Sequence, residues 1–440
     1  MKVLKFGGTS VGSPDRMKGV HQIITRDNDQ KIVVLSAVSG TTNILVDLSD
    51  KQKHNDKDGI KQVLETLFDK YQAFIKELYA KEEYFEKGKG IVDQYFSAIK
   101  AILEQPHSDQ LAKELVVQGE LISTNLFINY LLECELNANI ISAADFITLN
   151  DSGEPDLDLI GEKLGAILKN ESDKQILITQ GFICRNASGQ IDNLKRGGSD
   201  YSATLIGSSI NADEVQIWTD IDGMHNNDPR IVESTFPIAE LSFDEAGELA
   251  YFGAKILHPN CIRPAQQRNV PVRIKNTMDP DAKGTLITSN KNPDSVKAIA
   301  VKDGITAIKI KSSRMVLAYG FLRKVFEVFE RYKTPIDMIT TSEIAVSVTI
   351  DEASYLTEIL EEISPYGTVE VDKNQSIICI VGDFVAERKG VGVDIFKAME
   401  NIPVRMISYG GSKNNISLLI DTDFKKEALT ELNKQLFGLS

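Results

Sequence analysis

The start of the chain combines a lysine, two glycines and two hydroxyl side chains at a spacing suited to phosphate chemistry. Val3, Leu4 and Phe6 predict a short buried strand, which also contains Lys5. The strand is followed directly by Gly7, Gly8, Thr9 and Ser10. Glycines at this point let backbone N–H groups approach an anion without an intervening Cβ. An ordinary strand and tight turn would use the same residues, so this stretch alone leaves both interpretations open.

A second loop of mostly small and hydroxyl residues follows the next predicted strand. Residues 31–36 are apolar up to Ser36 and do not alternate, which is typical of a strand inside a parallel sheet. The loop 37–43 follows and contains Thr42. Ligands of open α/β sheets bind at the carboxyl ends of the strands. The two loops together therefore predict a ligand-binding edge.

Two further stretches place charged side chains where they could meet a ligand. Glu120 follows a glycine inside the apolar part of a helix predicted over 111–132, which suggests a carboxylate held against a cavity. A helix predicted over 201–210 is preceded by Arg196, Gly197, Gly198, Ser199 and Asp200. A helix N-terminus with an adjacent arginine favours an anion. Simple capping of the helix by Ser199 or Asp200 is the alternative.

The elements that must position these residues alternate between helices and buried strands. Ser13 and Pro14 predict the start of a first helix over 15–25, and residues 51–132 read as helices, the last of them amphipathic. Further strands are predicted over 176–179, 215–218, 272–275 and 285–287, with a linker at 290–294. This pattern favours an α/β fold with a mostly parallel central sheet.

The composition bounds the class of protein. A chain of 440 residues predicts two or three domains, and a net charge of -14 argues against a general nucleic-acid binder. We predict no signal peptide and no apolar run of membrane-spanning length. The four cysteines have no CxxC spacing and are expected to be free thiols in a reducing cytosol, so a cytoplasmic location is expected.

The C-terminal third contains an internal repeat. The segment 325–351 aligns with 395–421 at an offset of 70 residues at both ends and 68 in the middle. Each copy predicts strand, helix, strand, strand, helix, and Gly320 and Gly390 begin the first helix of each copy. The repeat therefore predicts two copies of one small α+β module.

The segment K-F-G-G-T-S at residues 5–10 resembles the opening of the aspartokinases, which belong to the amino-acid kinase family. The resemblance rests on five spaced motifs and the repeat, and it is strongest to the monofunctional lysine-sensitive type. It implies a three-layer α/β catalytic domain with a mostly parallel sheet over 1–292. Two ferredoxin-like ACT domains are implied over 300–373 and 374–440, with no dehydrogenase domain after them.

This resemblance implies that ATP, carried with Mg²⁺, phosphorylates the side-chain carboxylate of aspartate as the first step towards lysine, threonine and methionine. It implies catalytic roles for Lys5 and Asp200. Aspartate is expected at Ser36, Thr42, Glu120, Arg196 and Ser199, with Glu120 taking the ammonium group and Arg196 a carboxylate. The nucleotide is expected at Lys5, Gly7, Gly8, Thr9, Ser10, Thr219, Asp220, Asp228, Arg230 and Lys255. The metal is expected to be held mainly by the phosphates, with no protein ligand assigned.

The resemblance also implies feedback inhibition by lysine and a homodimer or homotetramer formed through the ACT domains. The lysine effector is expected at Met315, Gly320, Phe321, Asp337, Ser342 and Glu343. Asp337 and Glu343 would take its ammonium groups, although the pattern alone favours solvated charges at strand ends. Two departures from the family are Ala318, where relatives often have serine, and His225 in place of the usual tyrosine.

Two alternative functions remain open on the sequence. The first is a non-catalytic amino-acid sensor, in which the ACT pair binds a ligand and the N-terminal domain has lost its activity. Retention of Lys5, Glu120, Arg196 and Asp200 weighs against this. The second is a related kinase that acts on glutamate or acetylglutamate, which the helical insert and the ACT pair disfavour.

Overall fold

The computed structural model describes residues 1–195, 197–253, 257–291, 296–312, 319–383 and 385–439. The chain forms two compact units, and each is described by itself. The first consists of Met1–Met224 with Leu257–Ser289, and the second of His225–Ile256 with Asn290–Ser440. The second unit thus includes 225–256 in addition to the C-terminal third. The functional boundaries 1–292, 300–373 and 374–440 stay predictions.

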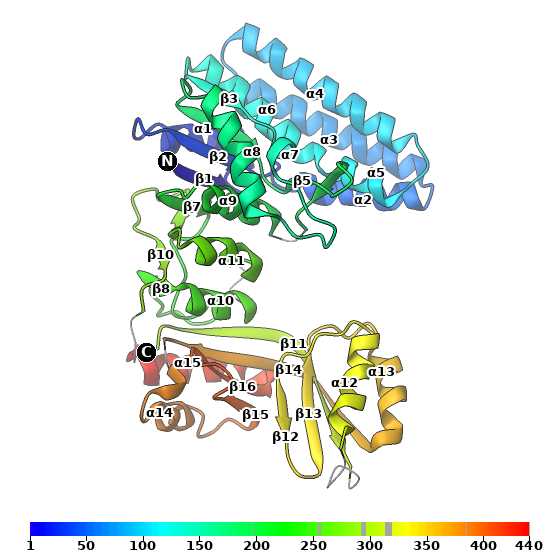
Figure 1. Cartoon of the computed structure of the whole chain (residues 1–440), viewed down its shortest axis with the longest axis vertical. Coiled ribbons are helices and arrows are strands. Elements are labelled where there is room, and N and C mark those ends of the chain that lie inside the picture. The colour runs from blue at the N-terminus through cyan, green and yellow to red at the C-terminus, as the bar shows by residue number, and fades with distance from the viewer. Residues whose placement is uncertain (196, 254–256, 292–295, 313–318, 384, 440) are drawn as a thin grey trace. The chain divides into compact units, whose positions relative to one another are not determined.

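The first unit is built on a mostly parallel sheet, as predicted (Figure 1). Its strands are β1 (Lys2–Phe6), β2 (Lys31–Leu35), β3 (Ala138–Ile140), β4 (Ile176–Gln180), β7 (Glu214–Thr219), β9 (Val272–Asn276) and β10 (Thr285–Thr288). They run in the order β3-β4-β2-β1-β7-β9-β10, and only β10 is antiparallel to its neighbour within this unit. The apolar, non-alternating strands β1 and β2 therefore lie at the centre of the sheet, buried on both faces.

Helices cover both faces of this sheet. Those of the unit are α1 (Pro14–Ile24), α2 (Thr41–Lys53), α3 (Lys57–Leu78), α4 (Glu82–Leu103), α5 (Asp109–Val116), α6 (Gln118–Glu133), α7 (Ala143–Phe146), α8 (Leu157–Asn170), α9 (Gly198–Ser209) and α11 (Pro259–Arg268), with a hairpin of β5 (Ile183–Arg185) and β6 (Ile191–Asn193). Leu4 and Phe6 of β1 pack into the core formed with the first helices. Because side chains alternate along a strand, Lys5 points to the other face, where α9 packs.

Local sequence signals account for several helix ends. Ser13 caps α1 by accepting a hydrogen bond from the Arg16 N–H, and Pro14 is its first residue, as predicted. The prediction of an amphipathic helix is wrong for α6, which is buried on nearly all sides. The stretch Asp109–Glu133 also meets the length and apolarity of a membrane span, contrary to prediction. However, 72% of its apolar window is buried inside the structure, so packing in the core accounts for its composition.

The second unit contains one continuous six-stranded antiparallel sheet in the order β12-β13-β11-β14-β16-β15. Its elements are β8 (Glu240–Ser242), α10 (Phe243–Tyr251), β11 (Ala298–Lys311), α12 (Phe321–Arg331), β12 (Ile339–Thr341), β13 (Ala345–Ile350), α13 (Leu356–Ile363), β14 (Thr368–Val381), α14 (Val391–Ala398), β15 (Val404–Tyr409), β16 (Asn415–Asp421) and α15 (Lys425–Phe437). Short 3₁₀ turns lie at Ser364–Tyr366, Val385–Glu387 and Thr422–Phe424.

The predicted repeat is confirmed in this unit. β11-α12-β12-β13-α13 and β14-α14-β15-β16-α15 have the same order of elements, and β11 begins 70 residues before β14. Gly320 and Gly390 are the N-caps of α12 and α14 with φ of 81° and 85°, a conformation that glycine adopts without strain. β11 and β14 pair with each other from end to end, so both modules share their two central strands.

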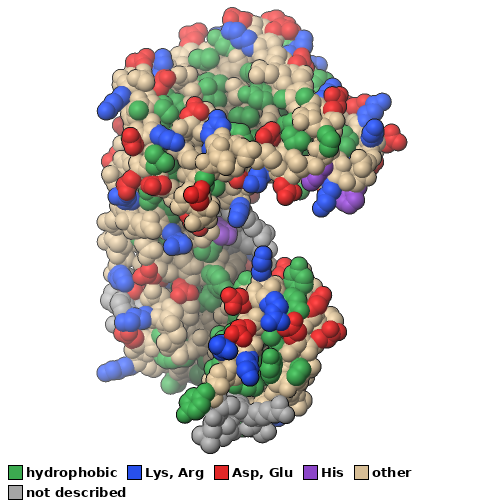
Figure 2. All heavy atoms as spheres, turned by 45° about the vertical axis from the view of Figure 1, so that its right-hand side comes forward, with side chains coloured by type: hydrophobic (Ala, Val, Ile, Leu, Met, Phe, Trp, Pro, Cys, Tyr) green, Lys and Arg blue, Asp and Glu red, His purple; other side chains and the backbone are tan. Residues whose placement is uncertain are grey.

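The surface carries both signs of charge. On the face drawn in Figure 2, acidic and basic side chains are interspersed with each other and with polar atoms. The four cysteines are free thiols, as predicted, and three of them are buried. Burial raises the pKa of the Cys184 thiol to about 12, so this side chain behaves as a small apolar group.

Candidate active site

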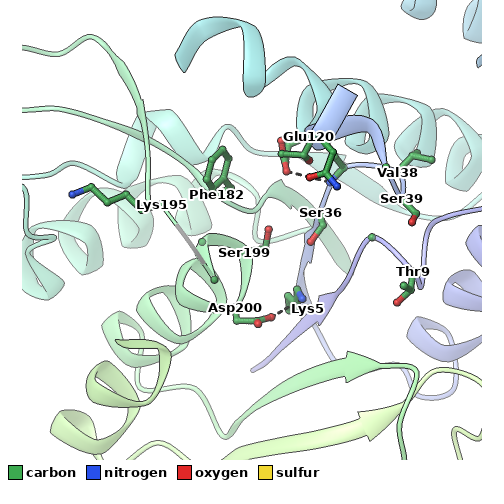
Figure 3. A pocket seen from close by; sticks show the side chains of 17 residues that line it. Lys5, Thr9, Ser36, Val38, Ser39, Glu120, Phe182, Lys195, Ser199 and Asp200 are labelled. Atoms are coloured by element: carbon green, nitrogen blue, oxygen red, sulfur yellow. Dashed lines mark hydrogen bonds and ion pairs between the residues drawn. The ribbon is translucent and has the colours of Figure 1, made fainter. Parts of the chain in front are cut away.

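A cavity of about 640 Å³ lies in the first unit where β1, β2 and α9 meet. It is lined by Lys5, Gly8, Thr9, Ser36, Ala37, Val38, Ser39, Gly40, Thr42, Asn43, Glu120, Phe182, Lys195, Gly197, Gly198, Ser199 and Asp200. Figure 3 shows the Lys5–Asp200 pair at one end of this group and Glu120 at the other, with Ser36 and Ser199 between them. The structure therefore brings together the four stretches that the sequence singled out.

Lys5 and Asp200 form a largely buried ion pair. Lys5 Nζ lies 2.5 Å from Asp200 Oδ1, and the two side chains are 10% and 15% exposed. Lys5 is fixed by a central strand and Asp200 by the first turn of α9. Since an ammonium group has three N–H donors, the pair leaves Lys5 with donors for a ligand in the cavity.

Only part of the glycine loop after β1 lines the cavity. Gly8 and Thr9 line it, and a Cβ on Gly8 would lie 3.0 Å from the Ala37 carbonyl oxygen, so glycine lets the two loops approach each other. The buried Ser10 hydroxyl is instead 2.7 Å from Thr277 Oγ1. Gly7 lies beside the lining and donates its N–H to the Trp218 carbonyl at 3.4 Å.

The second loop is shorter than predicted because α2 begins inside it. Gly40 is the N-cap of α2 with φ of 82°, and no side chain caps this helix end. Gly40, Thr42 and Asn43 all line the cavity. The uncapped N–H groups at a helix start favour an anion, so this end of α2 adds an anion-binding feature that the sequence did not reveal.

Glu120 is a buried carboxylate that lines the cavity, as its apolar surroundings predicted, and one of its oxygens is free. The residue is 3% exposed, and its Oε1 accepts a hydrogen bond from the Ala37 N–H at 3.3 Å. Its Oε2 has no hydrogen-bond partner among the described residues. Burial raises the pKa of Glu120 to about 8. A buried carboxylate with a free oxygen at the edge of a cavity is arranged to receive a cationic group.

The start of α9 places Ser199 and Asp200 in the cavity. Gly197 is the N-cap, with φ of 77°, and no side chain caps the helix. The alternative that Ser199 or Asp200 caps α9 is therefore wrong. A Cβ on Gly197 would lie 2.7 Å from the His258 Cβ, so α9 begins against the start of α11. The predicted Arg196 lies outside the described residues.

Two cavity residues that the sequence analysis missed have unusual backbones. Phe182 and Lys195 adopt φ of 70° and 60°, a region that residues other than glycine rarely enter and that is enriched at functional sites. The Ser202 hydroxyl fixes Phe182 by accepting its N–H at 2.9 Å. The Lys195 side chain points away from the Lys5–Asp200 pair in Figure 3. No sequence signal marks these conformations, whereas Val38, Ser39 and Asn43 could have been added from the predicted loop.

The other residues predicted to contact nucleotide lie outside the cavity lining. Thr219 ends β7, beside β1, and its hydroxyl is 3.2 Å from Asp220 Oδ1. Asp228 and Arg230 belong to the second unit, where they pair with each other at 2.6 Å. Hydrogen bonds from Arg230 lower the pKa of Asp228. Lys255 lies outside the described residues. The nucleotide roles of these residues stay predictions.

The predicted effector residues lie in the second unit, apart from Met315, which is outside the described residues. Gly320 and Phe321 begin α12, and Ser342 and Glu343 are exposed in the turn between β12 and β13. Asp337 differs from the solvated charge that the pattern favoured. Its side chain is 1% exposed and pairs with Lys302 at 2.7 Å.

Comparison with known proteins identifies the class. The model of the amino acid kinase family matches residues 1–276, and an ACT domain model matches residues 378–436. The chain therefore belongs to the amino acid kinase family, and the predicted fold class is confirmed.

Several aspartokinases are similar to this chain over its whole length. Lysine-sensitive aspartokinase 3 of Escherichia coli K12 is 33% identical over 447 residues, which cover 99% of each chain. Aspartokinase 3, chloroplastic, of Arabidopsis thaliana is 32% identical, and the alignment covers 99% of this chain and 81% of the Arabidopsis protein. The crystal structure of E. coli aspartokinase III with aspartate and ADP has a TM-score of 0.86 at 33% identity, covering 99% of this chain and 100% of its own. The structure of that enzyme with lysine and aspartate has a TM-score of 0.84 at 32% identity, covering 99% of both chains. The predicted resemblance to the aspartokinases is confirmed.

Proposed function

We propose that this chain transfers the γ-phosphoryl group of ATP to the side-chain carboxylate of L-aspartate, giving 4-phospho-L-aspartate and ADP. The observation that carries the proposal is a single cavity with the Lys5–Asp200 ion pair at one end and the unsatisfied Glu120 carboxylate at the other. The crystallisation of E. coli aspartokinase III with aspartate and ADP supports the choice of substrates.

The chemistry requires positive charge and N–H donors more than it requires a base. The attacking carboxylate has a pKa of about 3.9 and is ionised at neutral pH. It must approach a phosphoryl group that is also anionic, so the barrier falls when cations and oriented N–H groups surround both. Lys5 supplies a charge next to the glycine loop, and Asp200 holds that charge in place. The uncapped starts of α2 and α9 supply N–H groups.

Recognition of aspartate needs an anion for its ammonium group and polar groups for its carboxylates. Glu120 Oε2 would receive the ammonium group, because it is buried and lacks a partner among the described residues. Ser36, Thr42 and Ser199 also line the cavity and would donate hydrogen bonds from their hydroxyl groups. The carboxylate contact of Arg196 and the nucleotide contacts outside the cavity lining are carried over from the resemblance alone.

A magnesium ion fits this donor set as part of the bound nucleotide. Among the described residues, no three His, Cys, Asp or Glu side chains are grouped so that they could hold a metal. Mg²⁺ commonly takes most of its oxygens from substrate phosphates and water. Asp200, which lines the cavity, would help to organise the metal-bound phosphates, and the ion would neutralise charge on the transferring phosphoryl group.

An assay of ADP release tests the function and its alternatives together. The full chain with ATP and Mg²⁺ is expected to release ADP when aspartate is added, and much more slowly with glutamate or N-acetylglutamate. Hydroxylamine trapping of the acyl phosphate confirms the product. Turnover with acetylglutamate in preference to aspartate would favour the related kinase. No turnover with any of these substrates, in a chain that still binds lysine, would favour the non-catalytic sensor.

The protonation of Glu120 predicts how aspartate use depends on pH. Burial raises its pKa to about 8, so at pH 7 the free enzyme holds Glu120 mostly neutral and unable to pair with an ammonium group. The kcat/KM for aspartate is expected to rise about tenfold per pH unit below pH 8 and to level off above it. Initial rates between pH 6 and 9.5 measure this, with the KM for ATP as the internal control. A flat aspartate profile across that range would contradict the assignment.

The proposal extends to pathway and regulation. The product would be the first intermediate towards lysine, threonine and methionine, and lysine would inhibit through the first ACT module. The structure of E. coli aspartokinase III with lysine and aspartate supports lysine as the effector. A cytoplasmic location and a homodimer or homotetramer formed through the ACT modules complete the proposal.

Inhibition by lysine has a direct test. Lysine is expected to inhibit the wild-type enzyme, and Asp337→Ala combined with Glu343→Ala is expected to raise its IC50 at least about tenfold, because two carboxylates that face ammonium groups are removed. Threonine and methionine are the control effectors in the same assay. Inhibition by threonine alone, or lysine inhibition that survives both substitutions, would place the effector elsewhere.

A further inference from the structure

A compact charged cluster surrounds Asp337 in the second unit. Lys302 Nζ, from β11, lies 2.7 Å from Asp337 Oδ1 and 2.8 Å from Asp351 Oδ2. The Tyr251 hydroxyl, at the end of α10, donates to Asp337 Oδ1 at 2.8 Å. Lys302 Nζ also lies 4.7 Å from the centre of the Tyr251 ring. Asp337 Oδ1 therefore interacts with both the Lys302 ammonium group and the Tyr251 hydroxyl. The hydrogen bond from Tyr251 links the end of α10 to the sheet.

The negative charge of the cluster is not balanced by its own groups. It contains two carboxylates and one ammonium group, and Asp337 Oδ2 is buried without a hydrogen-bond partner among the described residues. A buried carboxylate oxygen in this state is costly unless a donor reaches it. With the Asp337 side chain only 1% exposed, a ligand ammonium group can reach it only after part of the cover moves.

Tyr251 is the part of that cover that is best placed to move. It is 43% exposed, whereas the Lys302 side chain is 18% exposed and is held by two carboxylates. Rotation of the tyrosine side chain would move its hydroxyl into water at the cost of one hydrogen bond. Removal of Lys302 would instead leave two carboxylates close together without their cation.

The internal repeat shows that this arrangement is specific to the first module. At the 70-residue offset, Asp372 corresponds to Lys302, and at the 68-residue offset Arg405 corresponds to Asp337. Arg405 and Asp372 also form an ion pair, but with the charges reversed and with side chains 47% and 37% exposed. An arginine stands where the first module offers a carboxylate, so the second module cannot receive an amine at the equivalent position.

α10 connects the cluster to the rest of the second unit. Glu248, one turn before Tyr251, accepts hydrogen bonds from Ser412 Oγ at 2.7 Å and from the Asn415 side-chain amide. Gly253 follows α10 with φ of 118°, and a Cβ there would lie 2.0 Å from the Val301 carbonyl oxygen. The end of α10 is thus seated on β11 next to Lys302.

We propose that Tyr251 competes with the effector's ammonium group for Asp337, so that the effector must displace the tyrosine hydroxyl in order to bind. This inference rests on the proposed inhibition by lysine and names a residue that sets the affinity for the effector. Without effector, the tyrosine hydroxyl occupies Asp337 and holds α10 on β11. With effector, an ammonium group binds the Asp337 carboxylate, and the tyrosine hydroxyl moves into water.

Tyr251→Phe separates this role from that of a direct ligand. The variant keeps the ring over Lys302 but loses the competing hydroxyl, so lysine is expected to bind and inhibit at about fivefold to tenfold lower concentration. Without lysine, kcat and both KM values are expected to stay within about twofold of wild type. Titration calorimetry measures binding and the ADP assay measures inhibition. Tyr409→Phe, an exposed tyrosine on β15, is the matched control and is expected to change neither.

The outcomes distinguish this inference from the proposals on which it rests. An unchanged or higher IC50 in Tyr251→Phe, with wild type inhibited by lysine, would overturn the competition and leave the function standing. Asp337→Asn is expected to abolish tight lysine binding, both alone and in combination with Tyr251→Phe. If Asp337→Asn binds lysine as wild type does, the effector lies elsewhere and both the effector site and this inference are wrong. Absence of aspartate-dependent ADP release from wild type would refute the proposed function itself.

Discussion

Lys5→Ala is expected to lower kcat by about two to three orders of magnitude. The reason is that Lys5 is the described cation fixed by an ion pair at the glycine loop, where charge on the transferring phosphoryl group must be stabilised. The KM for aspartate is expected to change much less, because the ammonium contact lies at the Glu120 end of the cavity. Steady-state kinetics with both substrates varied measure the two effects separately.

The Lys5→Ala experiment must distinguish a loss of catalytic rate from a loss of folding stability, because the substitution leaves Asp200 largely buried without its cation. The unpaired carboxylate is expected to lower the free energy of unfolding by about 1–3 kcal/mol. Adding Asp200→Asn removes the unpaired charge and is expected to restore stability without restoring turnover. Lys2→Ala, on the same strand but paired with surface aspartates, is the control expected to keep full activity. Near-normal turnover in a folded Lys5→Ala enzyme would remove Lys5 from the mechanism.

The sequence predicted those parts of the fold that depend on local pattern. Short apolar strands, the Ser13–Pro14 helix start and the glycine starts of α12 and α14 are encoded by neighbouring residues, and the structure has them as predicted. The extent of β11 and β14 was not predicted. A register shift between Lys302 and Ala307 breaks the alternation of β11, so the pattern does not show that one strand serves both modules. The inclusion of 225–256 in the second unit depends on distant side-chain contacts that no local signal carries.

The same division holds for the sites. Glu120 could be predicted as buried because a lone carboxylate followed a glycine in an apolar helix, and the glycine at 119 indeed allows close packing on Ala37. The place of Phe182 in the cavity could not be predicted, because its left-handed backbone is imposed by surrounding structure and not by its residue type. The burial of Asp337 was missed for a related reason. Its cover comes from Tyr251, 86 residues earlier in the chain.

Glu120→Gln is expected to raise the KM for aspartate by about two orders of magnitude at pH 8.5, with the KM for ATP nearly unchanged. At that pH the wild-type carboxylate is ionised, and replacing one member of a buried charge pair typically costs about 2–5 kcal/mol. Glu133→Gln is the matched control on the same helix. Glu133 is also buried, but it accepts hydrogen bonds from the Ala80 and Lys81 N–H groups away from the cavity. A KM that rises equally for aspartate and ATP would indicate a general distortion instead of a lost ammonium contact.

A second, independent prediction concerns how the stability difference between wild type and Glu120→Gln depends on pH. The pKa of Glu120 is raised on folding from its ordinary value of about 4.3 to about 8, so the unfolded chain ionises first as pH rises. Without substrate, wild type is therefore expected to lose stability relative to Glu120→Gln between pH 4.3 and 8, and to lose no more above pH 8. At about 1.4 kcal/mol per pKa unit, the upper bound is about 5 kcal/mol. Thermal unfolding at several pH values measures the difference, and parallel curves for wild type and variant would contradict it. Saturating aspartate is expected to raise the Tm of wild type much more than that of the variant, because only an ionised carboxylate pairs with the substrate ammonium group.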